Sequence, residues 1–173
     1  MEIGVIGMNE FAKTLCNHWI RRGHKILFAD LNLYSNGYTI AEKLGNQVSL
    51  TLPEKVGRQA EVIVLAVPMK TLPLAARALG SVQHKIVIDL IKEEKEGLDG
   101  DRRWSSFLEI QNLLPGAKIV KVTPEYPVHL YKQESSDSTL YFYSNDHLAQ
   151  RMVRWFVDGS GFKMIDLNTQ TIL

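Results

Sequence analysis

The sequence is poor in the residues that build disulfides and metal centres. Its 173 residues include one cysteine, Cys16, and five histidines scattered along the chain. A disulfide needs two cysteines, and a structural zinc site needs clustered Cys and His ligands, so we expect neither a disulfide nor a metal site. Cys16 falls on the apolar face of an expected helix, which favours a small core residue over a nucleophile.

The sequence also lacks an excess of one charge and any long apolar run. Lys and Arg number 20 against 19 Asp and Glu, for a formal net charge of +1, so no basic field attracts nucleic acid or an anionic membrane. No apolar run approaches the ~18 residues of a membrane span, and the N-terminus has the pattern of a strand rather than of a signal peptide. We therefore expect a cytoplasmic protein that binds a small-molecule ligand and neither nucleic acid nor a membrane.

Strand and helix patterns alternate along the chain. This order predicts the α/β class, as a Rossmann-type, doubly wound, mostly parallel sheet with helices on both faces. The length fits one domain, so we interpret residues 1–173 as a single Rossmann-type domain with no C-terminal substrate domain. The expected strands are Ile3–Gly7, His24–Asp30, Gln47–Leu52, Glu61–Val67, Lys85–Leu90, Lys118–Val122, Thr139–Tyr143 and Phe162–Leu167. The expected helices are Phe11–Ile20 (closed by Gly23), Tyr38–Leu44, Pro53–Ala60, Leu72–Leu79, Trp104–Leu114 and Asp146–Val157.

The first thirty residues have the layout of a dinucleotide-binding βαβ unit. The G-x-G-x-x-G/A template of such units is met at Gly7 and Ala12, whereas Asn9 occupies the position of the second glycine. Asp30 closes the second strand 23 residues after Gly7, close to the ~20 expected for a carboxylate that binds the ribose hydroxyl. Because this carboxylate would repel a 2′-phosphate, we expect Asp30 to favour NAD over NADP.

Asn9 decides whether this loop still binds a dinucleotide. Asn tolerates left-handed backbone angles, so the turn can form, but its side chain would enter the space of the pyrophosphate. Glu10 places a carboxylate in the first helical turn, where it competes with a phosphate for the helix dipole. The alternative is that Asn9 and Glu10 simply start and cap a helix. If the site binds a dinucleotide, we expect an affinity in the millimolar range. Asn9→Gly should tighten binding by tenfold or more, about 1.4 kcal/mol, and Glu10→Gln should tighten it by less.

Two polar segments do not fit regular elements. Lys92–Arg103 and Pro124–Ser138 each follow the carboxyl end of an expected parallel strand, the edge at which open α/β sheets bind ligands. In the first, Lys92–Glu96 is interpreted as a solvated mixed-charge face rather than as a site of acid/base chemistry. In the second, His129 is a candidate substrate contact because histidine is the side chain type that can change charge near neutral pH, although a histidine without a role is the simpler interpretation.

The apolar strands and their flanking residues come in the order and spacing of one known family. The segments that carry the likeness are Gly4–Gly7, Glu61–Pro68, Lys85–Asp89 and Leu114–Lys121, followed by Tyr141–Asp146 and Gly161–Leu167 near the end. On these segments the chain resembles the NADP oxidoreductases dependent on the deazaflavin coenzyme F420. It is also similar to the cytoplasmic reductase domain of the six-transmembrane metalloreductases.

The resemblance implies a hydride transfer between NAD(P)H and a planar flavin or deazaflavin acceptor. The protein would mainly hold two rings face to face, so no catalytic side chain is expected. The implied cofactor-binding residues are Gly7, Met8, Asn9, Glu10, Phe11 and Ala12 at the pyrophosphate, Asp30 and Leu31 after the second strand, and Ala66, Val67 and Pro68 beside the adenosine side and the bridge to the nicotinamide.

The chain departs from this family on the nicotinamide side. Leu90–Glu93 stands where the family tends to have Asn-Pro, and Thr123–Pro124 stands where it tends to have Phe-Asn. Three hypotheses follow. The first is an NAD(P)-binding oxidoreductase with a degenerate phosphate loop, and the second is a non-catalytic Rossmann module, either ligand-binding or acting as a homodimer. The third is a prephenate or hydroxyacid dehydrogenase type whose catalytic part lies on another chain.

Overall fold

The computed structural model describes residues 1–31, 37–92, 105–124 and 139–168. Within them the strands form one sheet in the order β3-β2-β1-β4-β5-β6-β7-β8. The strands are β1 (Glu2–Ile6), β2 (Lys25–Ala29), β3 (Val48–Leu50), β4 (Val62–Leu65), β5 (Ile86–Asp89), β6 (Lys118–Thr123), β7 (Thr139–Ser144) and β8 (Lys163–Asp166). The helices are α1 (Glu10–Arg21), α2 (Gly37–Leu44), α3 (Pro53–Gln59), α4 (Leu72–Leu79), α5 (Ser105–Leu113) and α6 (His147–Val157), with a 3₁₀ turn η1 (Met69–Thr71) before α4.

The sheet is mostly parallel, as the sequence predicts. Strands β1 to β6 pair in parallel, β7 is antiparallel to β6, and β8 is parallel to β7. The chain order reverses between β1 and β4, which makes this the switch point at which open α/β sheets bind ligands. The Rossmann-type, doubly wound fold is therefore confirmed.

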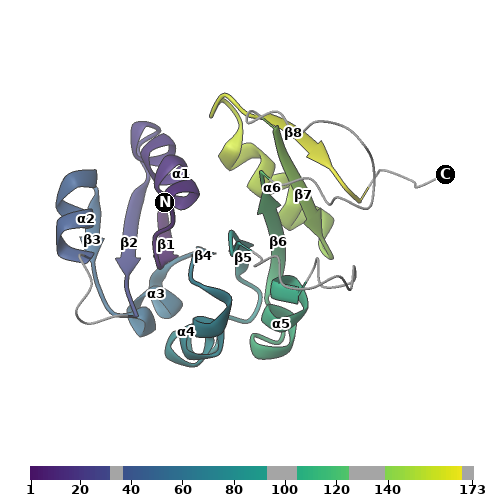
Figure 1. Ribbon diagram of the computed structural model, residues 1–173, viewed down its shortest axis with the longest axis horizontal. Coiled ribbons are helices and arrows are strands. Elements are labelled where there is room, and N and C mark those ends of the chain that lie inside the picture. The colour runs from purple at the N-terminus through teal and green to yellow at the C-terminus, as the bar shows by residue number, and fades with distance from the viewer. Residues whose placement is uncertain (32–36, 93–104, 125–138, 169–173) are drawn as a thin grey trace.

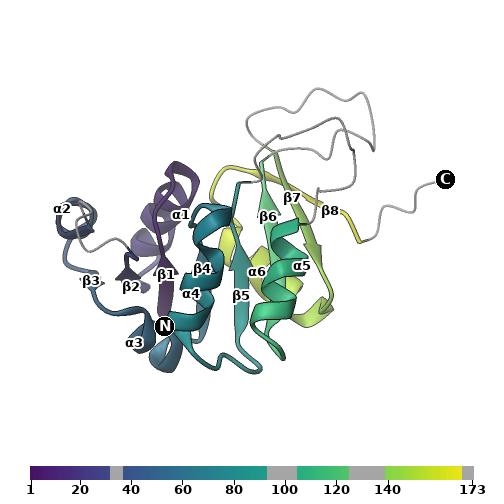
Figure 2. The ribbon, with the colours of Figure 1, turned by 60° about the horizontal axis from the view of Figure 1, so that its bottom comes forward.

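Helices cover both faces of the sheet (Figure 1). One buried cluster joins α1 and α6 to one face, and a second joins α3, α4 and α5 to the other. Figure 2 shows α4 and α5 side by side over their face of the sheet. The central strands β4 and β5 are buried along their whole length, which explains their continuous apolar sequences.

The face covered by α1 contains the single cysteine. Cys16 is fully buried, and burial raises the pKa of its thiol to about 12, so it is the core residue that the sequence predicts. On the same helix, the indole Nε1 of Trp19 donates a hydrogen bond of 3.0 Å to the carbonyl of Phe156 in α6. This bond satisfies a buried donor and ties the two helices of this layer together.

In the described part of the chain, no helix has the length and hydropathy needed to cross a bilayer. Of the two polar segments singled out above, only Lys92 and Pro124 fall within the described residues, and His129 lies outside them.

Candidate functional site

The carboxyl ends of the parallel strands bring the loop after β1 beside the ends of β2 and β4. Gly7 has φ +75°, and its N–H donates to the carbonyl of Ala29 at 2.9 Å. A Cβ at Gly7 would lie 2.8 Å from both the carbonyl oxygen of Ala66 and Cγ1 of Val67. Glycine is therefore required here by backbone angle and by close packing against β4.

Ala12 meets the last position of the glycine template. It is fully buried on α1 against the sheet, and its small side chain permits the close helix–strand approach that this position serves. Met8 and Phe11 are partly buried and pack against the same cluster, and the Phe11 ring meets that of Phe162 edge-on at 6.0 Å between centroids. The side chains of Met8 and Phe11 thus hold the loop against the buried core.

Asn9 adopts a conformation that the sequence did not predict. Its backbone is extended, with φ −87° and ψ 170°, so the turn does not use the tolerance of Asn for left-handed angles, and the positive φ lies at Gly7. Asn9 Oδ1 accepts a hydrogen bond of 2.8 Å from the Ala12 N–H. The interpretation of Asn9 as a helix cap is therefore confirmed, because this bond occupies one donor of the first turn.

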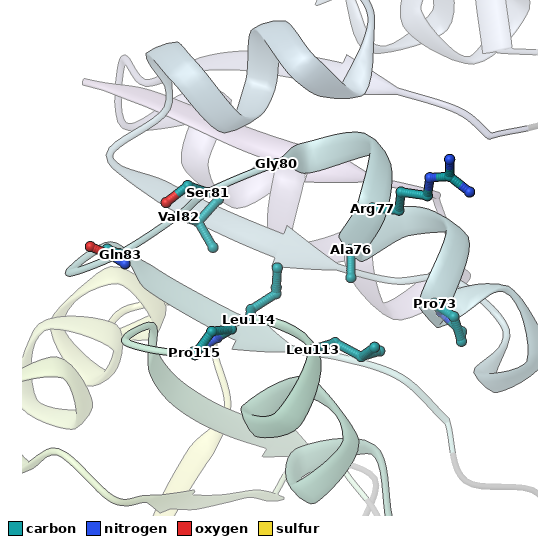
Figure 3. Close-up of a pocket in the computed structure, with 10 residues that line it drawn as sticks. All are labelled: Pro73, Ala76, Arg77, Gly80, Ser81, Val82, Gln83, Leu113, Leu114 and Pro115. Carbon is teal, nitrogen blue, oxygen red and sulfur yellow. The ribbon is translucent and has the colours of Figure 1, made fainter.

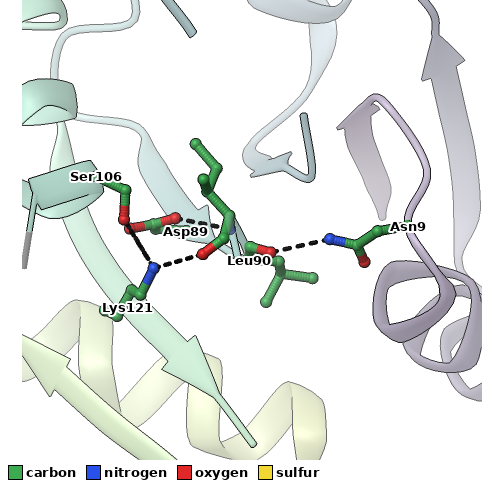
Figure 4. Close-up of polar contacts among 6 residues, drawn as sticks. Asn9, Asp89, Leu90, Ser106 and Lys121 are labelled. Atoms are coloured by element: carbon green, nitrogen blue, oxygen red, sulfur yellow. Dashed lines mark hydrogen bonds and ion pairs between the residues drawn. The ribbon is translucent and has the colours of Figure 1, made fainter. Parts of the chain in front are cut away.

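The other end of the Asn9 amide reaches a different loop. Asn9 Nδ2 donates to the carbonyl of Leu90 at 3.0 Å (Figure 4). Leu90 follows β5, and its own N–H donates to the carbonyl of Leu65 at the end of β4. Asn9 thus joins the loops that follow β1 and β5, 81 residues apart in the chain. No local sequence signal could have shown this contact.

A buried ionic cluster holds the loop after β5 (Figure 4). Asp89 and Lys121 are 0% and 3% exposed, with Lys121 Nζ 3.2 Å from Asp89 Oδ2. Lys121 Nζ also donates to the carbonyl of Ile91 and to Ser106 Oγ, both at 2.7 Å. Ser106 Oγ donates to Asp89 Oδ2 at 2.6 Å, and the Ile91 N–H donates to Asp89 Oδ1 at 2.9 Å.

This cluster is a structural feature beside the candidate site that sequence reasoning missed. Two buried opposite charges are tolerated only when each is paired and hydrogen-bonded, and here the contacts of both converge on Ile91. The available signal was a lysine at position 121 between Val120 and Val122, in the apolar middle of the strand. That pattern also fits a surface lysine, so the sequence alone did not identify the pair.

The remaining predicted site residues lie around this edge with different exposures. Asp30 directly follows β2 and is half-buried, and Leu31 packs partly against the cluster under α3, α4 and α5. Pro68 is exposed and precedes η1. Glu10 points to solvent, its side chain 93% exposed and 3.8 Å from Lys13 Nζ. An exposed pair of this kind contributes little to stability.

A groove of about 390 Å³ lies at the opposite edge of the sheet (Figure 3). The ends of α4 and α5 and the turns that lead into β5 and β6 line it, with Arg77 as a charged residue among mainly apolar neighbours. None of the predicted site residues lines this groove. The candidate site therefore stays at the carboxyl edge, where the switch point lies.

The sequence profile of the NADP oxidoreductases dependent on coenzyme F420 matches residues 2–93. The chain belongs to this family. The matched range runs from β1 through β5 and contains Gly7, Asn9, Asp30 and the Ala66–Pro68 segment. Family and fold together support an oxidoreductase of the NAD(P)-dependent class. No curated protein matches the sequence.

Several solved structures share the fold of this family member. A candidate F420-dependent NADP reductase from Arthrobacter sp. FB24 has a TM-score of 0.76 at 21% identity, over 96% of this chain and 84% of its own. A hypothetical protein from Sinorhizobium meliloti has a TM-score of 0.74 at 21% identity, with the same coverage of 96% and 84%. A pyrroline-5-carboxylate reductase from Coxiella burnetii has a TM-score of 0.68 at 18% identity, and 97% of this chain spans 59% of it. The similarity to six-transmembrane metalloreductases stays a prediction.

Proposed function

We propose that this member of the F420-dependent family binds a nicotinamide dinucleotide along the carboxyl edge and exchanges hydride between it and a planar acceptor of the flavin or deazaflavin type. The observation that carries the proposal is the turn at Gly7. It stands at the switch point with φ +75°, beside Asp30 on one side and Ala66 and Val67 on the other. These are the places that the fold reserves for pyrophosphate and ribose.

The loop at the carboxyl edge offers some, but not all, of the backbone donors that a dinucleotide pyrophosphate would use. The N–H groups of Glu10 and Phe11 belong to the first turn of α1, where helix geometry gives them no partner in the helix and aims them at an anion. The Ala12 N–H is already engaged by Asn9. The loop thus offers a phosphate fewer donors than a glycine at position 9 would leave. This supports weak binding, in the millimolar range that corresponds to about 4 kcal/mol.

Bound at this edge, the nicotinamide would supply the hydride chemistry, which requires no acid or base from the protein. The chain would contribute binding, orientation and exclusion of water. Asp30 would accept the hydrogen bonds of the adenosine ribose and would discriminate against a 2′-phosphate by charge repulsion. We therefore expect NADH to bind more tightly than NADPH.

Titration of the purified protein with NADH and NADPH, followed by nicotinamide fluorescence, tests the proposal. Asp30→Asn should reduce or reverse the preference for NADH, whereas Glu42→Gln, the same loss of charge on the exposed face of α2, should leave it unchanged. A clear preference of the wild type for NADPH would contradict the role given to Asp30. Oxidation of NADH by added flavin or deazaflavin, measured at saturating acceptor, tests the transfer itself.

A second function is favoured by the contacts of Asn9. Its side chain already engages the Ala12 N–H, a first-turn donor that a phosphate would use, and it also bonds the Leu90 carbonyl. A non-catalytic Rossmann module that binds another small ligand or acts as a homodimer would have this arrangement. Absence of any NADH or NADPH binding, with dimerisation seen in analytical ultracentrifugation, would favour this alternative over the oxidoreductase.

A further inference from the structure

We propose that the Asn9–Leu90 hydrogen bond is a latch across the switch point. With the latch closed, the site admits the adenosine half of a dinucleotide, and the nicotinamide half enters only when the bond opens. This inference rests on the proposed function, because it concerns the same site. It makes Asn9 a positioning residue that decides how much of the ligand is bound.

The strand order places the latch on one side of Gly7 only. At the carboxyl edge, Ile6 pairs with Ala29 of β2 on one side and with Leu65 of β4 on the other, and Leu65 pairs with Asp89 of β5. Asp30 therefore lies on the β2 side of Gly7. The Asn9–Leu90 bond runs to the loop after β5 (Figure 4), and in the sheet β4 lies between β1 and β5.

A doubly wound fold is built from two mononucleotide-binding halves that meet at the switch point. The half that contains β1, β2 and β3 carries Asp30 and would hold the adenosine nucleotide. The half that contains β4, β5 and β6 would hold the other nucleotide. The bond from Asn9 to Leu90 connects the two halves where a dinucleotide would pass from one to the other, so the bond and an extended dinucleotide compete for this space.

The latch is fixed firmly at its Leu90 end. The residues on both sides of Leu90 are bonded into the buried cluster, with Asp89 paired to Lys121 and the Ile91 carbonyl accepting from Lys121 Nζ at 2.7 Å. The Leu90 N–H is bonded to β4. Opening the latch by moving this loop would disturb buried charges, whereas rotating the half-buried Asn9 side chain costs only its own hydrogen bonds. The moving part is therefore Asn9.

Asn9→Ser isolates the latch from the cap. Serine is a good N-cap residue, so the bond to the Ala12 N–H is retained, but its hydroxyl is too short to reach Leu90. Asn9→Gly would remove both contacts and is less informative. Asn9→Thr serves as a second cap-retaining variant, and Asn17→Ser, an exposed position on the same helix, is the matched control.

The experiment is an NMR titration of the four proteins with AMP and with NADH, following backbone amide signals. In the wild type, AMP should shift the signals of Gly7 and Asp30 and leave those of Leu90 and Ile91 unchanged, and NADH should bind within about twofold of AMP. In Asn9→Ser and Asn9→Thr, NADH should bind about threefold to tenfold more tightly, the worth of one neutral hydrogen bond, with AMP unchanged. Asn17→Ser should match the wild type.

The outcomes separate the latch from the proposed function. Equal NADH affinity in the wild type and in both cap-retaining variants would overturn the latch while leaving the dinucleotide function standing. An equal gain for AMP and NADH would also overturn it, because the latch acts on the nicotinamide half alone. Absence of shifts with either nucleotide in all four proteins would contradict both proposals.

Discussion

The N-cap residues of two helices at opposite edges of the sheet make the same capping hydrogen bond but differ in their second contact. Asn9 at α1 and Asp146 at α6 each accept, through Oδ1, an N–H three residues ahead, from Ala12 and Ala149 respectively, at 2.8 Å. Their second polar atoms differ. Asn9 Nδ2 donates to the Leu90 carbonyl at 3.0 Å, whereas Asp146 Oδ2 lies 3.5 Å from Lys118 Nζ.

The difference follows from the direction of the strands. β1 is parallel to its neighbours, so α1 begins at the carboxyl edge with the loops of the candidate site. β7 is antiparallel to β6, so α6 begins at the other edge, beside the start of β6. A charged cap suits the helix dipole, and at Asp146 the nearby Lys118 also favours the charge. At the carboxyl edge an amide provides both an acceptor for the cap and a donor for the neighbouring loop.

The largest expected effect comes from breaking the anchor behind Asn9. Lys121→Met leaves the buried Asp89 carboxylate without its partner, so we expect the free energy of unfolding to fall by about 3–5 kcal/mol. Lys118→Met, in the same strand, removes only the half-exposed partner of Asp146 and should cost about 1 kcal/mol or less. Urea unfolding at pH 7 measures both. Similar losses in the two variants would show that Lys121 is not the anchor.

The next effect tests the turn that carries Asn9. Gly7→Ala should lower the free energy of unfolding by about 3 kcal/mol, roughly 1 from the positive φ and roughly 2 from the clash with β4. Gly23→Ala is the matched control, because Gly23 has φ +81° and a Cβ added there would meet nothing within 4 Å. It should cost about 1 kcal/mol. Equal costs in thermal or urea unfolding would mean that the packing against Ala66 is loose.

The stability lost on removing each cap residue should depend on pH for Asp146 but not for Asn9. Asn9→Ala and Asp146→Ala should each cost about 1–2 kcal/mol at pH 7. The hydrogen bond from the Ala149 N–H lowers the pKa of Asp146 in the folded protein. The contribution of Asp146 to the free energy of unfolding is therefore complete above the pKa of ~3.9 of an unfolded carboxyl group. It is lost as the pH falls through the lower pKa of the folded state. The cost of Asp146→Ala should therefore shrink below about pH 4, while that of Asn9→Ala should not. A parallel decline of the two in acid unfolding curves would contradict this.

The smallest effect comes from two histidines near the end of α1. Burial, chiefly, together with nearby positive charges that include Arg22, lowers the pKa of His18 and of His24. The folded protein thus favours the neutral form of both rings. Their contribution to the free energy of unfolding is complete above the pKa of ~6.5 of an unfolded histidine and is lost as the pH falls below it. The double variant His18→Gln/His24→Gln should flatten the stability curve between pH 7 and 5. His147→Gln, at an exposed position, should keep the wild-type slope, and an unchanged slope in the double variant would refute the assignment.

The sequence by itself determined the fold and predicted where the candidate site lies in it. Short apolar runs and apolar residues at helical spacing depend only on neighbouring residues, so the strands and helices were predictable within a few residues, as were the turn at Gly7 and the acid after β2. The tertiary structure decided the antiparallel direction of β7, the buried pair of Asp89 and Lys121, and the extended backbone and second hydrogen bond of Asn9. Each of these depends on which strands become neighbours, and a contact between residues 81 positions apart has no trace in the local pattern.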